Sequence, residues 1–197
     1  QDLLAAAAFL RDIPTVDPAL IGYRGSSMGA FYGLKAAPMA DFTAMVLLCP
    51  ANETTMLQAI DQDSVIDSRE DTERPDPRTP DTEDPGSSEH THPSTDPTRW
   101  DKSRLRAYFQ HQDSEVLARM VTCPVMLVHA RDDAVVPLAH SLHLAELLRG
   151  EVELVALEGG SHSSAQHDPF VHLRSLEWLS QKMAQTKKGI PRRLLRG

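Results

Sequence analysis

Ser27 lies in a short glycine-flanked segment, Gly25-Ser26-Ser27-Met28-Gly29, between an apolar run and a stretch of helical composition. A serine at such a strand–turn–helix junction can act as a nucleophile, because small neighbours permit the sharp bend that lifts its hydroxyl above a sheet. The N-terminus of the following helix would point at the same place, and the Met28 N–H could then stabilise an oxyanion. The pattern alone is weak evidence, so the hypothesis requires a base and an acid elsewhere.

His162 is the candidate base, because a serine hydroxyl is a poor nucleophile at neutral pH unless a base takes its proton. It lies in Glu158-Gly159-Gly160-Ser161-His162, a glycine-rich loop directly after a predicted strand. That position would bring the ring to the carboxyl edge of a parallel sheet. His167 is close by and is the rival base, although it adjoins the start of a predicted helix.

Asp133 is the candidate acid that fixes the tautomer and orientation of the base. It follows a predicted strand in His129-Ala130-Arg131-Asp132-Asp133-Ala134-Val135-Val136-Pro137. Asp132 remains an alternative on the residues alone, and either aspartate could instead serve only as a turn or helix cap.

The other histidines of the ordered part have ordinary structural interpretations. His129 ends a strand and should pack or hydrogen-bond locally, whereas His140 and His143 are expected on the surface of a helix. Arg24 and Arg131 flank the site in sequence, and each could bind a substrate carboxylate or form a surface ion pair.

Short apolar runs alternate with helical segments along the chain, which predicts a parallel α/β sheet. We expect four strands, at residues 19–23, 42–49, 124–129 and 152–157, and helices at residues 3–11, 30–37, 104–109, 114–120, 138–148 and 169–182. Asp168 is the expected N-cap of the last helix, with Pro169 at its first position. Pro38 is expected to end the second helix.

The net charge of −8 is confined to one segment. Residues 61–99 contain twelve acidic and four basic residues, a sum of −8, and the rest of the chain has sixteen of each sign. This Pro-, Ser- and Thr-rich stretch has too few apolar side chains to offset the entropy of ordering, so we predict a disordered acidic insert. It divides residues 1–60, which contain the serine, from residues 100–185, which contain short helices, the acid and the base. Residues 186–197 form a basic tail.

Several classes of protein and site are not expected from the composition. No run approaches a membrane span, no secretion signal opens the chain, and no basic surface suggests nucleic acid. The two cysteines, Cys49 and Cys123, are expected to be free buried thiols, which favours a reducing cytoplasm. Two cysteines at this spacing do not suggest a zinc site, and the proposed chemistry requires no metal or organic cofactor.

Taken together, the three blocks around Ser27, Asp133 and His162 resemble the C-terminal part of the α/β-hydrolase superfamily, in its chain order of serine, acid and histidine. The glycine-flanked serine and the strand end Leu48-Cys49-Pro50-Ala51 are similar to bacterial serine esterases and peptidase-type hydrolases. The resemblance covers all but the insert and the tail. It implies that the acid is the aspartate four residues before Pro137, which is Asp133.

This resemblance also implies an eight-stranded sheet, of which about four strands are recognisable here. We therefore expect a partial α/β-hydrolase fold, a chain that is a fragment and lacks its start, and a weak catalyst, since Met28 N–H is the single oxyanion donor encoded. The expected reaction is hydrolysis of an ester, thioester or amide of a small-molecule acyl substrate through an acyl-enzyme on Ser27. A cofactor-free acyltransferase would use the same residues. The alternative is an inactive or incomplete hydrolase that acts through a partner, and the oligomeric state stays open.

Overall fold

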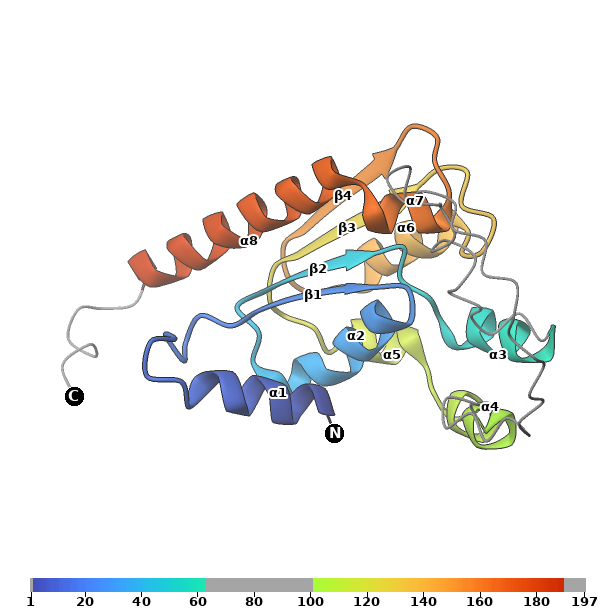
Figure 1. Ribbon diagram of the computed structural model, residues 1–197, viewed down its shortest axis with the longest axis horizontal. Coiled ribbons are helices and arrows are strands. Elements are labelled where there is room, and N and C mark those ends of the chain that lie inside the picture. Colours follow the sequence, from blue (N-terminus) through green and yellow to red (C-terminus); the bar gives the residue numbers. More distant parts are fainter. Residues whose placement is uncertain (1, 63–100, 190–197) are drawn as a thin grey trace, which may run out of the picture.

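The computed structural model describes residues 2–62 and 101–189 of the 197-residue chain, and Figure 1 shows its arrangement. Four strands form one sheet with the order β1-β2-β3-β4, and every neighbouring pair is parallel. The strands are β1 (Gly22–Ser26), β2 (Ala44–Leu48), β3 (Val125–Ala130) and β4 (Val152–Leu157). The prediction of a mostly parallel sheet of about four strands flanked by helices is therefore confirmed.

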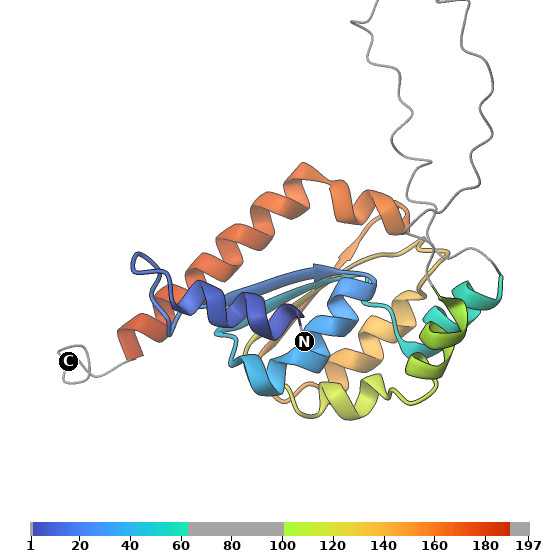
Figure 2. The ribbon, with the colours of Figure 1, turned by 60° about the horizontal axis from the view of Figure 1, so that its bottom comes forward.

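Helices cover both faces of this sheet (Figures 1 and 2). One face packs mainly against α1, α2 and α6, and the other packs against α8. The helices are α1 (Asp2–Arg11), α2 (Met28–Ala40), α3 (Glu53–Asp61), α4 (Lys102–Phe109), α5 (Ser114–Ala118), α6 (Leu138–Leu147), α7 (His162–His167) and α8 (Pro169–Gly189). Because all four strands run parallel, their C-terminal ends lie at the same edge of the sheet, and the chain between consecutive strands crosses over one of its faces.

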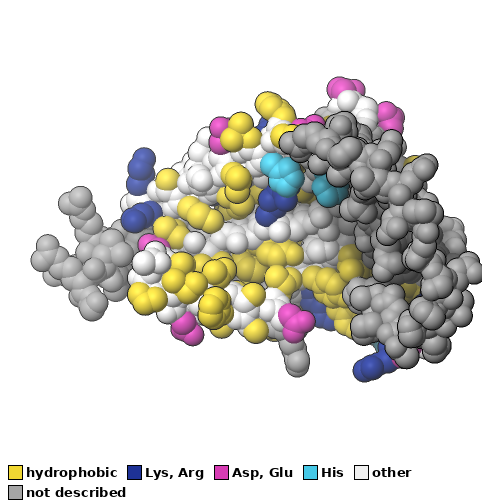
Figure 3. Space-filling model, in the orientation of Figure 1, with side chains coloured by type: hydrophobic (Ala, Val, Ile, Leu, Met, Phe, Trp, Pro, Cys, Tyr) yellow, Lys and Arg dark blue, Asp and Glu magenta, His cyan; other side chains and the backbone are white. Residues whose placement is uncertain are grey.

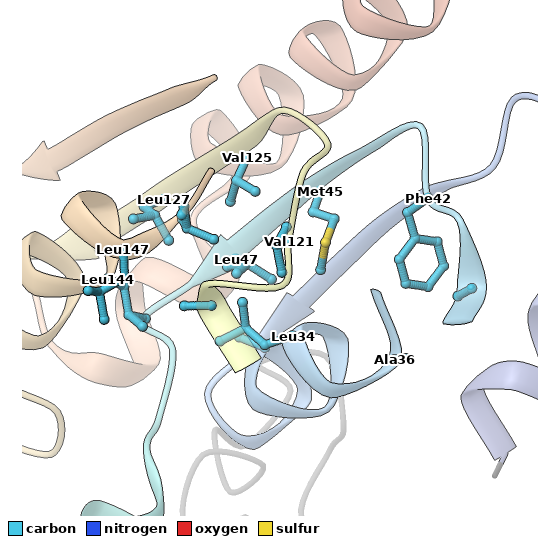
Figure 4. Close-up of a cluster of buried hydrophobic side chains, with 14 of the residues drawn as sticks. Leu34, Ala36, Phe42, Met45, Leu47, Val121, Val125, Leu127, Leu144 and Leu147 are labelled. Carbon is cyan, nitrogen blue, oxygen red and sulfur yellow. The ribbon is translucent and has the colours of Figure 1, made fainter. Parts of the chain in front are cut away.

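The core divides between the two faces because side chains alternate along a strand. Met45 and Leu47 of β2 join the cluster beneath α1, α2 and α6, together with Leu34 and Leu127 (Figure 4). Val46 and Leu48 point to the opposite face and pack with Trp178 and Leu179 of α8. Both central strands are buried along their whole length, which is typical of a parallel sheet with helices on both sides.

Strand β1 has a strand partner on one side only within the described residues. Tyr23 stacks on Phe42 at 5.1 Å between ring centroids, and its ring occupies the space next to Gly33, where a Cβ would overlap it. On the face seen in Figure 3, hydrophobic side chains gather over α1 and the loop after it, where Phe9 is 68% exposed. Among the described residues, the outer edge of β1 therefore has unpaired backbone groups, and α1 exposes apolar side chains such as that of Phe9.

Several predicted boundaries were wrong. The first strand is Gly22–Ser26 rather than residues 19–23, because pairing with the buried strand β2 outweighs the weak strand propensity of its glycines and polar residues. Helix α2 continues through Pro38 to Ala40, where Asp41 ends it in a left-handed conformation. The proline lies near the end of the helix, so one missing hydrogen bond does not break it.

Two helices differ more substantially from the prediction. Helix α3 was not predicted, and its last residue, Asp61, falls inside the segment assigned to the insert. Helix α8 extends to Gly189 rather than residue 182, with Lys187 and Lys188 in its last turn, where cations favour the helix dipole. The predicted basic tail therefore begins as helix.

We predicted that the acidic insert, residues 61–99, is disordered. Residues 63–100 lie outside the described part of the chain, and so do residues 190–197 of the tail. Asp168 caps α8 as predicted, since its Oδ1 accepts a hydrogen bond of 2.7 Å from the Phe170 N–H. Within residues 2–62 and 101–189, no helix is both long enough and apolar enough to cross a membrane.

Candidate active site

Ser27 occupies the sharp junction between β1 and α2, with φ 50° and ψ −119°. A side chain at this positive φ is strained, and the surrounding hydrogen bonds hold it there. The Ser27 N–H donates to the Leu48 carbonyl at 2.8 Å, and the Ser27 carbonyl accepts from the N–H groups of Phe31 and Ala51, each at 3.2 Å. The end of β2 therefore fixes the turn that carries the serine.

The two glycines that flank the serine have different roles. A Cβ at Gly25 would lie 2.6 Å from the Tyr23 hydroxyl oxygen and 2.9 Å from the Gly29 carbonyl carbon, so a side chain there would displace the turn. A Cβ at Gly29 would meet the Tyr23 hydroxyl at 4.0 Å, which is ordinary contact. Close packing of helix on strand thus requires glycine at position 25 but not at position 29.

His162 lies between Ser27 and Asp133 and is hydrogen-bonded to both. Its Nε2 is 2.9 Å from Ser27 Oγ, and its Nδ1 is 2.7 Å from Asp133 Oδ2. In the neutral tautomer that suits this arrangement, Nδ1–H donates to the carboxylate and Nε2 accepts from the serine hydroxyl. His162 is the first residue of α7, a helix that was not predicted and that Ser161 caps.

Asp133 is held by backbone donors as well as by His162. Its Oδ1 accepts from the N–H groups of Val135 and Val136, each at 2.8 Å, and its side chain is fully buried. Burial alone would raise the pKa of Asp133, but these hydrogen bonds and the contact with His162 hold the pKa below its usual value. The carboxyl is therefore ionised at neutral pH despite its burial.

The sequence left open Asp132 as the acid and His167 as the base. Asp132 is exposed and is not hydrogen-bonded to His162, and His167 is an exposed residue at the end of α7. The described structure therefore brings Ser27, Asp133 and His162 together and leaves both alternatives outside the group.

Met28 is the first residue of α2, directly after the serine. The N–H groups of a helix's first turn have no acceptor within the helix. The Met28 N–H therefore directly follows Ser27 in the chain and has no acceptor within α2, and its role as an oxyanion donor stays a prediction. The Met28 side chain packs in a cluster with Phe31 and Phe109.

His129 is buried and hydrogen-bonded locally, as expected. Its Nδ1 is 2.7 Å from Ser141 Oγ and its Nε2 is 2.8 Å from the Val136 carbonyl. Burial lowers the pKa of His129, so the ring is neutral and Nε2–H donates to that carbonyl. The same nitrogen is 3.4 Å from Asp133 Oδ2, which places His129 behind the acid.

His140 is half-buried rather than at the surface as predicted, whereas His143 is exposed as expected. The His140 Nδ1 is 3.4 Å from Asn52 Nδ2, and its Nε2 is buried with no hydrogen-bond partner among the described residues. Burial lowers the pKa of His140 to about 4, and the nearby Glu53 carboxylate only partly opposes this. The ring is therefore neutral at pH 7.

We expect the free energy of unfolding to fall by about 2 kcal/mol between pH 7 and pH 5 because of His140 alone. The unfolded histidine takes up a proton near pH 6.5, whereas folded His140 does so only near pH 4. The unfolded state thus binds more protons between these values, so stability is lost as the pH falls. In urea unfolding, the free energy of unfolding of His140→Gln should fall between pH 7 and pH 5 by about 2 kcal/mol less than that of the wild type.

His143→Gln is the matched control, because His143 lies on the same helix with its Nε2 3.1 Å from the exposed Glu115 carboxylate. This variant should keep the pH dependence of the wild type. If His140→Gln lost as much stability as the wild type between pH 7 and pH 5, the buried neutral state of His140 would be excluded.

The two arginines near the site differ from each other. Arg131 forms an exposed ion pair with Glu158 at 2.8 Å, which is the surface role that the sequence allowed. Arg24 lies on β1, and its Nε and Nη2 are buried with no hydrogen-bond partner among the described residues. Burial lowers the pKa of Arg24 without removing its charge. The described structure supplies no anion for this guanidinium.

Cys49 is the residue near the site whose position the sequence did not reveal. Its thiol, the Asp133 carboxylate and a His162 ring nitrogen lie within 4.8 Å of one another, a group with the atom types of a metal site. Asp133 and His162 are already hydrogen-bonded to each other, so a metal ion would have to replace the proton between them. Cys49 and Cys123 are both free thiols.

Comparison with solved structures gives the same fold at low sequence identity. Acetyl xylan esterase 1 from Thermoanaerobacterium sp. JW/SL YS485 is similar with a TM-score of 0.56 and 15% identity, over 90% of this chain and 51% of that one. Est1E from Butyrivibrio proteoclasticus, with ferulic acid bound, gives 0.63 and 20%, over 93% and 67%. Pyrococcus horikoshii acylaminoacyl peptidase gives 0.55 and 20%, over 90% and 26%.

The chain thus spans about half the length of the acetyl xylan esterase. A comparison with curated proteins gives no match. The sequence does match a protein-family model, that of the prolyl oligopeptidase family, over residues 1–186. The match includes the Ser27, Asp133 and His162 blocks and nearly the whole chain, so this protein belongs to the prolyl oligopeptidase family of α/β-hydrolases.

Proposed function

We propose that the chain forms a serine-hydrolase active site in which Ser27 is the nucleophile, His162 the general base and Asp133 the orienting acid. The observation that carries this proposal is the continuous pair of hydrogen bonds, 2.9 Å from Ser27 Oγ to His162 and 2.7 Å from His162 to Asp133. An alcohol hydrogen-bonded to an imidazole, which is itself oriented by a carboxylate, is the arrangement that activates a serine.

The proposed reaction has two halves. In the first, His162 Nε2 takes the proton of Ser27 as its Oγ attacks the acyl carbonyl, and then returns that proton to the leaving group. This leaves an acyl group on Ser27. In the second half, His162 takes a proton from the water molecule that attacks the acyl carbonyl, and returns this proton to Ser27 Oγ as the acid is released. Asp133 stays ionised throughout, because its hydrogen bonds keep its pKa low, and it stabilises the imidazolium.

The Met28 N–H would donate to the oxyanion that forms in each half-reaction. Its place at the start of a 13-residue helix adds the positive end of the helix dipole to that donor. No step of this scheme requires a metal or an organic cofactor.

The substrate class that we propose is a small molecule with an ester, thioester or amide bond to an acyl group. The similar structures include an acetyl xylan esterase and an acylaminoacyl peptidase, which supports both ester and amide chemistry. A cofactor-free acyltransferase would differ only in the acceptor of the second half-reaction. The free thiols Cys49 and Cys123 favour a reducing compartment, and we propose the cytoplasm.

A fluorophosphonate probe tests this proposal, because it reacts with an activated serine whatever the substrate. We expect the folded 197-residue chain to be labelled once, with the adduct on the peptide that contains Ser27. Heat-denatured protein is the control, and it should not be labelled. Labelling of a different residue would contradict the assignment of Ser27.

A second candidate function is a hydrolase body that becomes active only with a partner. Two observations on the described residues favour it: β1 pairs with a strand on one side only, and the buried Nε and Nη2 of Arg24 have no hydrogen-bond partner there. In that case the purified chain would resist the probe at any concentration and would be labelled only after a partner covers that edge.

A further inference from the structure

Cys49 follows the last residue of β2 and has a left-handed backbone, with φ 41°. Alternation along β2 would direct it to the same face as Met45 and Leu47, beneath α2 and α6. It packs instead with Ala130 and with Ala165 of α7. The left-handed conformation is therefore what turns the Cys49 side chain away from the large core cluster and toward the candidate active site.

A cysteine is a costly residue for this backbone conformation, which glycine adopts without strain. Retention of strain at a site calls for an interaction that compensates for it. The Cys49 thiol has such a neighbour, since it lies within 4.8 Å of both the Asp133 carboxylate and a His162 ring nitrogen. Cys49 itself is 0% exposed, so no part of it can reach a substrate.

The chemical state of this thiol suits a hydrogen-bond donor. Burial raises the pKa of Cys49 to about 12, and the charge of Asp133 and a hydrogen bond with it act in the same direction. The backbone of Ala130 acts in the opposite direction but does not outweigh burial. The thiol therefore remains protonated, and its S–H is a donor that can point at the carboxylate.

We propose that Cys49 is a positioning residue for the proposed hydrolysis, whose S–H donates to the Asp133 carboxylate and holds it against His162. This inference rests on the proposed function of Ser27, His162 and Asp133. The backbone donors from Val135 and Val136 both bind Oδ1 of that carboxylate, whereas Oδ2 is the oxygen that His162 contacts. A thiol donor within 4.8 Å adds to the two amides that hold this carboxylate.

His129 is the other titratable group beside Oδ2, at 3.4 Å, but its Nε2–H is directed to the Val136 carbonyl at 2.8 Å. It is neutral and has a partner of its own. The thiol thus has a role at the carboxylate that His129 does not duplicate.

Two variants test this role. Cys49→Ala removes the donor and leaves a small apolar side chain, whereas Cys49→Ser restores a hydroxyl donor at nearly the same place. We expect Cys49→Ala to lower kcat for a short activated ester about three- to fivefold, as for loss of one weak hydrogen bond, with KM unchanged because Cys49 cannot touch substrate. Cys49→Ser should recover most of kcat.

A purely structural role predicts the opposite order. Burying a hydroxyl in place of a thiol costs stability, so Cys49→Ser would then be the worse variant, and the losses would follow the melting temperature. That order, or an equal kcat for wild type and Cys49→Ala, would overturn the proposal. A chelator belongs in every assay, since the thiol, carboxylate and imidazole could together bind a stray metal ion.

A second measurement does not depend on turnover. The proton shared by His162 Nδ1 and Asp133 Oδ2 should give a far-downfield proton NMR signal in the intact chain. We expect this signal to move or broaden in Cys49→Ala and to return in Cys49→Ser. If the wild type showed the signal but no hydrolysis, the proposed function would fail, and the effect of Cys49→Ala on the signal would still test the role of Cys49. An unmoved signal in Cys49→Ala would overturn that role alone.

Discussion

Ser27→Ala should abolish fluorophosphonate labelling and reduce ester hydrolysis to the background rate. Ser27 Oγ is the one hydroxyl that the described structure places 2.9 Å from His162 Nε2, so no other serine can take its place without a new geometry. In serine hydrolases of this kind, loss of the nucleophile lowers turnover by up to about 10⁶-fold. Labelling intensity and the rate with p-nitrophenyl acetate measure the two effects.

The fold of this variant should be preserved, because the change removes one oxygen and keeps the Ser27 backbone bonds to Leu48, Phe31 and Ala51. Circular dichroism and thermal melting establish that point. Ser26→Ala is the matched control, since Ser26 is the adjacent residue at the end of β1. Loss of labelling in Ser26→Ala with labelling retained in Ser27→Ala would reverse the assignment of the nucleophile.

Asp133→Asn should lower turnover by about 10⁴-fold while the protein remains folded. An asparagine can present its NH₂ group to His162 Nδ1, which favours the tautomer with the proton on Nε2, and that nitrogen can then no longer accept the Ser27 proton. The substitution also removes the charge that stabilises the imidazolium. Steady-state kinetics on the same ester should show the loss in kcat rather than in KM.

Asp132→Asn provides the matched control, because Asp132 is the adjacent residue, is exposed, and is not hydrogen-bonded to His162. Its turnover should stay within a small factor of the wild type. Because Asp133 also accepts two backbone N–H bonds, melting curves must accompany both variants. If Asp132→Asn lost more activity than Asp133→Asn, the acid would have to be reassigned.

Candidate site residues could be proposed from the sequence because each lies in a recognisable local pattern, either a glycine-flanked turn or a loop directly after a strand. Glycine at position 25 is required by close packing of α2 on β1, and the sequence shows that glycine directly. The acid and base each follow an apolar run, and parallel strands bring the residues after them to one edge. A serine, an acid and a base could therefore be grouped without any coordinates, and the resemblance to the α/β-hydrolases selected Asp133 over Asp132.

Local patterns were less reliable where pairing or packing decides the outcome. Strand β1 is made of Gly, Tyr, Arg, Gly and Ser, and only its hydrogen bonds to β2 make it a strand. Helix α7 and the burial of His140 depend on residues far away in sequence, such as Asn52, which is 88 positions from His140. Such contacts cannot be predicted from residues that are neighbours in the sequence.

By itself the sequence determined the parallel α/β class of about four strands and the glycine-flanked turn at Ser27, because periodicity and turn residues are local properties. The residues alone left Asp132 and His167 open beside Asp133 and His162, and the hydrogen bonds of the structure join Asp133 to His162 and His162 to Ser27. The tertiary structure alone decided that the Cys49 thiol lies within 4.8 Å of the Asp133 carboxylate, that the His140 ring is neutral, and that Nε and Nη2 of Arg24 are buried with no hydrogen-bond partner among residues 2–62 and 101–189. These features follow from which elements pack together, and burial and hydrogen bonding across distant segments set the charge state and direction of each side chain.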